Sequence, residues 1–344
     1  MSIDFHAHLA REDPNAPPFM RDLFDVEGYL EKQEAAGIDR TVLSYALEDE
    51  RVEMDDVKRE HDFLANLLET YPGRFSALAA LDPFGGDEWL AEGERVLELG
   101  FSGFCLPTSV GGRYLDSVDA RDAFDFAAER DSLILLHPSA APIDPSRAGH
   151  RLVGAWVGRP YDTGICLSRM LLADTLSRYP SLRVVVAHSG GTLPMLIGRL
   201  EHVHKGLARM AGFSGGGPPG GGPPGGGGPS GGGGPPKGPP GGMVPEEAAL
   251  HADTAGRPLA DRLDQLYLDT ASYHPAAITA AIATVGIDRV VLGTDFPPAG
   301  DSPEAAIETL DDCGLSESDR SKILTGNGRA LLDRTARSVT QEAT

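Results

Sequence analysis

The chain has 344 residues, enough to bury a large core, and this length fits either one large α/β barrel or two ordinary domains. Its 30 lysines and arginines against 51 aspartates and glutamates give a net charge of −21, which argues against nucleic acid or an anionic membrane as a partner. No apolar stretch approaches the roughly 20 residues that span a bilayer, and no basic segment with an apolar run begins the chain, so we expect a cytoplasmic protein.

Short β-rich runs alternate with helical periodicity along the chain, which is typical of parallel βαβ units. We predict eight strands, at residues 3–8, 41–45, 75–81, 103–106, 133–137, 183–188, 265–269 and 289–295. The helix predicted after each of them covers residues 26–36, 55–71, 88–99, 120–129, 163–178, 193–205, 275–285 and 303–313. Eight strand–helix pairs predict an α/β fold, a (β/α)8 TIM barrel.

Residues 214–242 interrupt this alternation, because 26 of these 29 residues are glycine or proline. Such a segment has almost no side chain to bury and cannot offset the entropy lost on ordering. We expect a disordered, protease-sensitive insertion within one barrel domain that spans residues 1–344. An interdomain linker is the weaker interpretation, because two predicted strands follow the segment and complete the barrel.

Two histidines, His6 and His8, stand one residue apart at the end of the first predicted strand. Residues i and i+2 of a strand point to the same side, so both imidazoles can converge on one metal ion. The spacing also arises by chance, and two surface histidines on an edge strand are the alternative. The metal interpretation therefore needs support from other strands.

That support comes from His137, His188 and Asp295, which end the fifth, sixth and eighth predicted strands. In a (β/α)8 barrel the carboxyl ends of all strands form one mouth, where active sites are built. A single histidine after an apolar run is more often structural, but five polar groups at one mouth indicate a metal site. Three histidines and one carboxylate suit one divalent ion, with Zn²⁺ expected first and manganese, iron or cobalt as alternatives. His188 then need not bind the ion and could transfer protons.

Four short motifs are similar to the motif set of the amidohydrolase superfamily. They are His6-Ala7-His8, His137-Pro138, His188-Ser189-Gly190-Gly191 and Gly293-Thr294-Asp295-Phe296-Pro297. Further agreement lies at residues 158–163, 178–183, Pro194, Arg199 and Asn327. More narrowly, the chain resembles the amidohydrolase-related branch that contains aminocarboxymuconate-semialdehyde decarboxylase, over nearly its whole length except the insertion.

The resemblance implies roles for these residues. By it, the metal ligands are His6, His8, His137 and Asp295, and the acid/base is His188. Binuclear relatives use a carboxylated lysine at the end of strand four, where this chain has no lysine, so a single ion is expected. Cys105 lies about where that lysine would fall, and it either packs in the core or bridges a second ion.

The chain also departs from its relatives. Resorcylate-type decarboxylases place a glutamate three residues after the acid/base histidine, where this chain has Gly191. Aminocarboxymuconate-semialdehyde decarboxylase binds the substrate carboxylate with an arginine shortly before the first helix; here the nearby arginine is Arg21, which is equally well explained as a solvated surface residue. The same enzyme lends an arginine, followed by proline, to the neighbouring subunit, and Arg257-Pro258 resembles that pair. Because such relatives are commonly dimers, a homodimer is expected.

The leading functional hypothesis is a metal-dependent decarboxylase, a lyase that acts on a small carboxylated unsaturated or aromatic-derived molecule through a metal-bound water. A metal-dependent hydrolase of a lactone, an amide or a related bond is the alternative. A barrel that serves as a non-catalytic scaffold is the third hypothesis. The substrate pocket is expected in the loops after the strands, with Tyr45, Tyr273 and His274 among its residues and Trp156 and Tyr161 either there or in helix packing.

Overall fold

The computed structural model describes residues 1–47, 52–139, 149–213, 257–297, 299–300 and 302–342, so the predicted insertion at 214–242 lies outside the described residues. In the described part, seven parallel strands form one sheet in the order β1-β2-β3-β4-β7-β8-β9. Their bounds are β1 (Ser2–Ala7), β2 (Ile38–Ser44), β3 (Phe75–Ala80), β4 (Gly103–Pro107), β7 (Leu133–His137), β8 (Val184–Val186) and β9 (Leu266–Leu268).

An extended segment closes the ring between the last strand and the first. The amide of Val291 donates to the carbonyl of Leu268 in β9 at 3.0 Å, and the amide of Phe5 in β1 donates to the carbonyl of Leu292 at 2.8 Å. The segment forms no regular strand, because the amide of Gly293 donates to the Thr270 hydroxyl at 3.0 Å instead of to a backbone carbonyl. The eighth strand predicted at 289–295 is therefore present as an irregular closing segment, and the barrel fold is confirmed.

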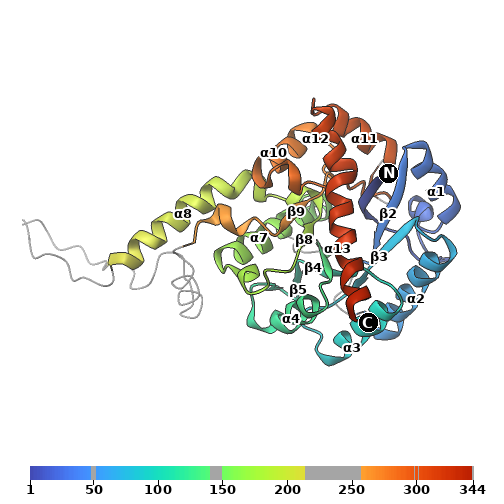
Figure 1. The fold of residues 1–344 in the computed structure, drawn as a ribbon, viewed down its shortest axis with the longest axis horizontal. Coiled ribbons are helices and arrows are strands. Elements are labelled where there is room, and N and C mark those ends of the chain that lie inside the picture. Colours follow the sequence, from blue (N-terminus) through green and yellow to red (C-terminus); the bar gives the residue numbers. More distant parts are fainter. Residues whose placement is uncertain (48–51, 140–148, 214–256, 298, 301, 343–344) are drawn as a thin grey trace, which may run out of the picture.

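Helices surround the ring on its outside, as Figure 1 shows. Their bounds are α1 (Val26–Ala35), α2 (Met54–Thr70), α3 (Asp87–Glu98), α4 (Arg121–Glu129), α6 (Arg151–Trp156), α7 (Gly158–Leu172), α8 (Leu193–Phe213), α10 (Pro275–Val285), α11 (Pro303–Asp311), α12 (Glu317–Ser321) and α13 (Asn327–Glu342). Helix α8 runs outward from the barrel (Figure 1). None of the described helices combines the length and the apolar character that crossing a membrane requires.

Some element bounds differ from the prediction for local reasons. The helix predicted at 163–178 begins earlier, at Gly158, because Pro160 is tolerated in a first helical turn. It ends at Leu172, since Asp174 adopts a left-handed φ of 49°. A hairpin of β5 (Ser109–Val110) and β6 (Arg113–Tyr114) adds to the predicted elements.

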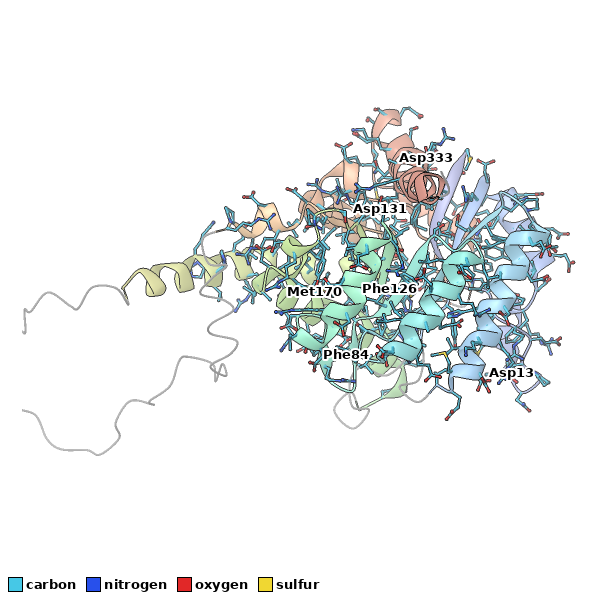
Figure 2. The ribbon with its side chains drawn as sticks, turned by 60° about the horizontal axis from the view of Figure 1, so that its bottom comes forward. Asp13, Phe84, Phe126, Asp131, Met170 and Asp333 are labelled. Carbon is cyan, nitrogen blue, oxygen red and sulfur yellow. The ribbon has the colours of Figure 1, made fainter. Side chains whose placement is uncertain are left out.

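The two ends of the barrel carry different segments. Figure 2 shows Asp131 and Asp333 on one side of the molecule and Phe84 on the other. Asp131 precedes β7 and lies 3.4 Å from the guanidinium of Arg334 in α13, whereas Phe84 follows the carboxyl end of β3. Helix α13 therefore covers the amino-terminal end of the strands, and the mouth formed by their carboxyl ends is on the opposite side.

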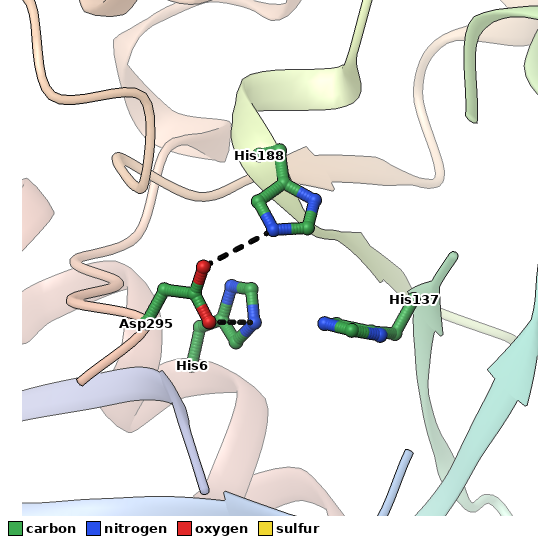
Figure 3. A group of neighbouring side chains, drawn as sticks. All are labelled: His6, His137, His188 and Asp295. Carbon is green, nitrogen blue, oxygen red and sulfur yellow. Dashed lines mark hydrogen bonds and ion pairs between the residues drawn. The ribbon is translucent and has the colours of Figure 1, made fainter. Parts of the chain in front are cut away.

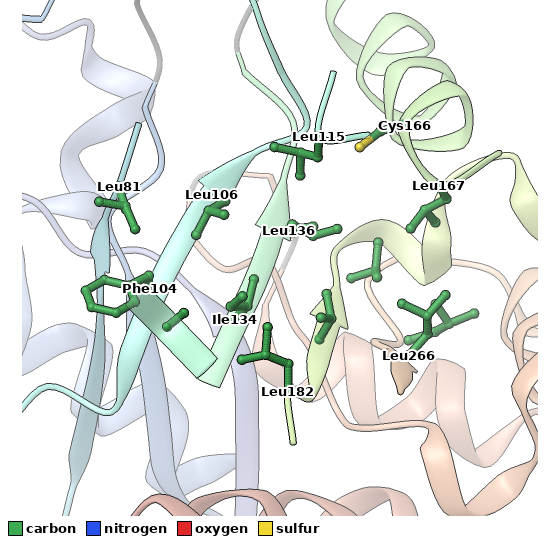
Figure 4. Close-up of a cluster of buried hydrophobic side chains, with 14 of the residues drawn as sticks. Leu81, Phe104, Leu106, Leu115, Ile134, Leu136, Cys166, Leu167, Leu182 and Leu266 are labelled. Carbon is green, nitrogen blue, oxygen red and sulfur yellow. The ribbon is translucent and has the colours of Figure 1, made fainter. Parts of the chain in front are cut away.

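Apolar side chains form two layers around the sheet. One cluster joins strands all round the ring and includes Phe5, Leu78 and Cys105, as side chains that point into a barrel do. The other joins the alternate strand residues to the helices, as Leu136 and Leu167 show in Figure 4. Cys105 is 1% exposed, so the prediction that it packs in the core is confirmed.

Candidate metal centre

The polar residues predicted at the strand ends meet at the mouth. The ligand atoms of His6, His137, His188 and Asp295 all lie within 4.8 Å of one another (Figure 3). The Nε2 atom of His8 lies 3.2 Å from that of His6 and 3.4 Å from Asp295 Oδ1. Four imidazole rings and one carboxylate thus face one another across the mouth.

The hydrogen bonds of His6 and His8 fix which ring nitrogens carry protons. His6 Nδ1 donates to Asp269 Oδ2 at 2.6 Å, and His8 Nδ1 donates to the carbonyl of Ser44 at 3.0 Å. In the neutral rings both Nε2 atoms therefore carry lone pairs, yet they face each other at 3.2 Å and also face Asp295 Oδ1 at 3.3 and 3.4 Å. Lone pairs this close repel unless a cation lies between them, so the donor set fits a divalent metal ion.

Two further observations support this fit. In the described part of the chain, the buried Nδ1 atoms of His137 and His188 have no hydrogen-bond partner. Burial, together with the neighbouring histidines, holds the pKa of His137 well below its usual value, so this ring stays neutral. Burial opposes the ionisation of Asp295, but His6 and the other histidines outweigh it and hold the pKa of that carboxyl well below its usual range. A neutral imidazole and an ionised carboxylate are the forms that bind metal.

The pKa of His6 is raised, whereas those of His137 and Asp295 are lowered. Burial alone would lower it, but the carboxylates of Asp295 and Asp269 outweigh that effect and raise the pKa to about 9. The surroundings of His6 thus favour positive charge, which a proton or a metal ion can supply.

Asp269 is a site residue that the sequence-based prediction missed. It is completely buried and accepts hydrogen bonds from His6 Nδ1 and from the backbone amides of His188, Ser189 and Ala271, at 2.6 to 3.1 Å. It therefore orients the imidazole of His6 and fixes the backbone at His188. The signal was available, because Asp269 ends the seventh predicted strand as the other polar residues end theirs.

We expect Asp269→Asn to weaken metal binding about 10- to 100-fold, because the amide keeps one acceptor oxygen and points an NH2 group at these donors. Competition with a coloured chelator measures the change. Asp162→Asn is the matched control, since this carboxylate is also buried but is held by the hydroxyls of Thr108, Ser109 and Tyr114. Equal metal affinities of the two variants would contradict the role of Asp269.

A second buried carboxylate, Asp4, links the segments that carry His6 and Asp295. It accepts hydrogen bonds from the amide of His6 and the amide of Thr294, both at 3.1 Å, and from the Thr294 hydroxyl at 2.7 Å. The pairing of β1 with β2 also shifts register between Asp4 and Ala7, and such a bulge re-aims side chains. Both features place His6 against the closing segment.

The backbone around the centre is strained. His188, Tyr273 and Asp295 have φ values of 55°, 56° and 54°, in the left-handed region that residues other than glycine rarely adopt. Such conformations cost on the order of 1–3 kcal/mol each and cluster at functional sites. The hydroxyl of Tyr273 donates to Asp295 Oδ2 at 2.9 Å, so this predicted residue does reach the centre.

The other three predicted substrate residues have contacts outside the metal centre. His274 is exposed and caps α10 by accepting from the amide of Ala276. Arg21 is exposed in a 3-10 turn at 18–23. Arg257 pairs with Asp174 at 2.7 Å, before β9, and so lies at the amino-terminal end of the strands, away from the mouth of its own barrel.

Gly191 has a steric role. Its φ is 61°, and a Cβ atom at this position would overlap the carbonyl oxygen of Pro160 in α7. The loop after β8 therefore packs so closely against α7 that no side chain fits. The glutamate of resorcylate-type relatives has no room here in this backbone conformation.

Gly191→Ala is expected to destabilise the fold by about 2 kcal/mol or more, because it adds a backbone clash to the cost of a left-handed φ. Gly198→Ala is the matched control, since a Cβ atom there meets nothing within 4 Å and alanine favours a helix. Urea unfolding of both variants measures the difference. Equal unfolding midpoints would show that the loop moves away from α7 at no cost.

The chain matches the amidohydrolase family over residues 3–334. It is 24% identical to 2-amino-3-carboxymuconate-6-semialdehyde decarboxylase from Dictyostelium discoideum, over 79% of this chain and 65% of that protein. It is also 24% identical to gamma-resorcylate decarboxylase from Polaromonas sp., over 93% of this chain and 91% of that protein. The chain thus spans slightly under two thirds of the Dictyostelium relative and most of the Polaromonas one.

Solved structures show the same architecture. The fold is similar to that of dihydroxybenzoic acid decarboxylase from Polaromonas sp., solved with bound manganese and the inhibitor 2-nitroresorcinol. The TM-score is 0.72 at 24% identity, and the alignment covers 96% of each chain. Together with the match over residues 3–334, which includes every residue of the candidate metal centre, this shows that the chain belongs to the amidohydrolase family.

Proposed function

We propose that this chain is a metal-dependent decarboxylase of a small carboxylated, unsaturated or aromatic-derived molecule. The observation that carries the proposal is the set of lone pairs of His6, His8 and Asp295 that face one another at 3.2 to 3.4 Å. This arrangement calls for a cation, and the relatives that share the family are named decarboxylases. The gathering of His6, His137, His188 and Asp295 at one mouth disfavours a non-catalytic scaffold, which has no need of such a cluster.

We assign His6, His8, His137 and Asp295 as the residues that would hold one divalent ion. When bound, such an ion supplies a fixed positive charge and Lewis acidity. The bound manganese of the Polaromonas structure supports Mn²⁺ as strongly as the ligand types support Zn²⁺. Metal analysis after reconstitution with each ion decides between them.

His188 is the proposed acid/base. Decarboxylation breaks the bond between the substrate carbon and its carboxylate, releases carbon dioxide and leaves an electron pair on that carbon, which must then take up a proton. The His188 imidazole lies at the mouth with Nε2 3.2 Å from Asp295 Oδ2 and can deliver this proton. Asp295 and Tyr273 hold the site around it, since Tyr273 donates to the same Asp295 oxygen.

Hydrolysis of a lactone, an amide or a related bond is the second candidate function. Gly191 favours it, because this chain lacks the glutamate of resorcylate-type decarboxylases. The test is incubation of the metal-loaded protein with unsaturated and aromatic acids and with lactones, followed by product mass. Loss of carbon dioxide without gain of water supports the lyase, and gain of water without loss of carbon dioxide overturns it.

We also propose that the chain forms a homodimer. Six large apolar side chains on α6, α7, α8 and the junction between α6 and α7 are 45–79% exposed: Leu152, Val153, Trp156, Val157, Tyr161 and Met195. Arg257 lies away from the mouth of its own barrel, as expected of an arginine lent to a neighbouring subunit's site. Sedimentation of the wild type and of Trp156→Glu tests the association, and a monomeric wild type would contradict it.

A further inference from the structure

Tyr273 lies in the loop after β9 and reaches the candidate metal centre from an exposed position. The residue is 43% exposed, yet its hydroxyl donates to Asp295 Oδ2 at 2.9 Å. Its φ of 56° lies in the left-handed region and is an outlier for a bulky side chain. Such a conformation persists only where the surrounding structure imposes it. Contacts of the neighbouring residues must therefore hold this loop in place.

Hydrogen bonds just before Tyr273 fix its loop to two neighbouring segments. The Thr270 hydroxyl donates to the carbonyl of Gly293 at 3.1 Å and accepts from the amide of the same residue at 3.0 Å. The Ser272 hydroxyl accepts from the Ser189 hydroxyl at 2.9 Å. Gly293 belongs to the closing segment, and Ser189 directly follows the proposed acid/base. The loop is thus tied to the segments that carry the carboxylate and the acid/base of the centre.

The two oxygens of the Asp295 carboxylate have different partners. Oδ1 lies 3.3 Å from Nε2 of His6 and 3.4 Å from Nε2 of His8. Oδ2 accepts from the Tyr273 hydroxyl at 2.9 Å and lies 3.2 Å from Nε2 of His188 (Figure 3). A carboxylate oxygen offers about two lone-pair sites. Two donors therefore occupy Oδ2, while Oδ1 keeps its lone pairs on the side of the assigned ligands.

The two donors on Oδ2 have different parts in the proposed reaction. His188 is the proposed acid/base, so its proton goes to the substrate carbon during turnover and Oδ2 then loses that hydrogen bond. Tyr273 takes no part in this transfer, and its loop is fixed, so its hydroxyl stays on Oδ2. Carboxylates can bind a metal ion through one oxygen or through both. Without the tyrosine hydroxyl, Oδ2 would be free to turn toward the ion.

We propose that Tyr273 is a positioning residue that holds the Asp295 carboxylate so that it binds the metal ion through Oδ1 alone. The inference rests on the proposed function and deepens it, because a catalytic metal site keeps a coordination position open for water or substrate. A second carboxylate oxygen would occupy such a position. The sequence predicted Tyr273 in the substrate pocket, whereas in this scheme it acts through Asp295.

Tyr273→Phe tests the proposal, because it removes only the hydroxyl and leaves the ring in place. The purified apoprotein is loaded with Co²⁺, whose visible absorption depends on the number and the geometry of its ligands. In the variant, Oδ2 should join the ion as a further ligand atom. The absorption per bound cobalt should therefore fall below that of the wild type, because these bands weaken as the number of ligand atoms rises.

Tyr114→Phe is the matched control. The Tyr114 hydroxyl also donates to a buried carboxylate, Asp162 Oδ1 at 2.8 Å, but this carboxylate is not part of the candidate metal centre. Weaker cobalt absorption in Tyr273→Phe but not in Tyr114→Phe supports the proposal, and equal absorption in Tyr273→Phe and the wild type overturns it. The spectra need no turnover, so they decide the role of Tyr273 even if no acid tested loses carbon dioxide and the decarboxylase function fails.

Steady-state kinetics with a substrate that is turned over separate positioning from substrate binding. The loss of a hydrogen-bond partner of a metal ligand lowers activity about 10- to 100-fold. In Tyr273→Phe this loss should fall on kcat and leave KM little changed, because the hydroxyl contacts Asp295 and not the substrate. A raised KM at an unchanged kcat would place Tyr273 against the substrate and overturn the positioning role.

Discussion

Replacement of Asp295 by alanine is expected to remove the metal ion and, with it, catalysis. The carboxylate lies 3.3 Å from His6 Nε2 and 3.4 Å from His8 Nε2, so it supplies negative charge to the proposed ion. A bound ion stabilises a transition state by several kcal/mol. At about 1.4 kcal/mol per tenfold, kcat/KM should fall on the order of 10³-fold or more. Elemental analysis of the purified variant, alongside initial rates, measures both effects.

The matched control for Asp295 is Asp312→Ala. Asp312 is exposed at the end of α11. Its replacement by alanine removes the same charge as Asp295→Ala but leaves the mouth of the barrel unchanged. It should keep its metal and its rate. An Asp295→Ala protein that retains one equivalent of metal after gel filtration would show that the histidines suffice, and the assignment of Asp295 as a ligand would be wrong.

Replacement of His188 by alanine is expected to separate turnover from metal binding. The loss of a positioned proton donor costs about 10²- to 10⁴-fold in kcat. The metal content should stay near that of the wild type, because the four assigned ligands, His6, His8, His137 and Asp295, remain. Single-turnover rates and metal analysis of the same preparation provide the test.

The geometry also allows the opposite result for His188. Its ligand atom lies within 4.8 Å of those of His6, His137 and Asp295, so it could bind the ion itself. Loss of metal from His188→Ala would place it among the ligands and leave the acid/base role to another group. His202 is an exposed histidine on α8, so His202→Ala is the control for the removal of an imidazole. It should change neither the turnover rate nor the metal content.

The sequence predicted the repeating architecture because strands of a parallel barrel are buried on both faces and appear as apolar runs. Residues 133–137 and 275–285 were predicted with the bounds that β7 and α10 have. The irregular backbone of the eighth strand could not be predicted from the sequence. Its regular ladder is broken where Gly293 bonds to the side chain of Thr270, and a bond between segments far apart leaves no trace in local periodicity.

The sequence by itself determined which polar side chains reach the mouth of the barrel, because the carboxyl ends of all parallel strands in a barrel lie at that mouth. It did not determine how these side chains are held. Asp269 meets His6 only because the ring closes and brings the seventh strand near the first, and that contact sets the proton on the imidazole. Nor did the sequence predict that the side chain of His274 accepts from the amide of Ala276 and so caps α10. Proton positions and long-range partners depend on distances that only the closed barrel sets, and these distances bring the Nε2 atoms of His6 and His8 together as the proposed metal-binding pair.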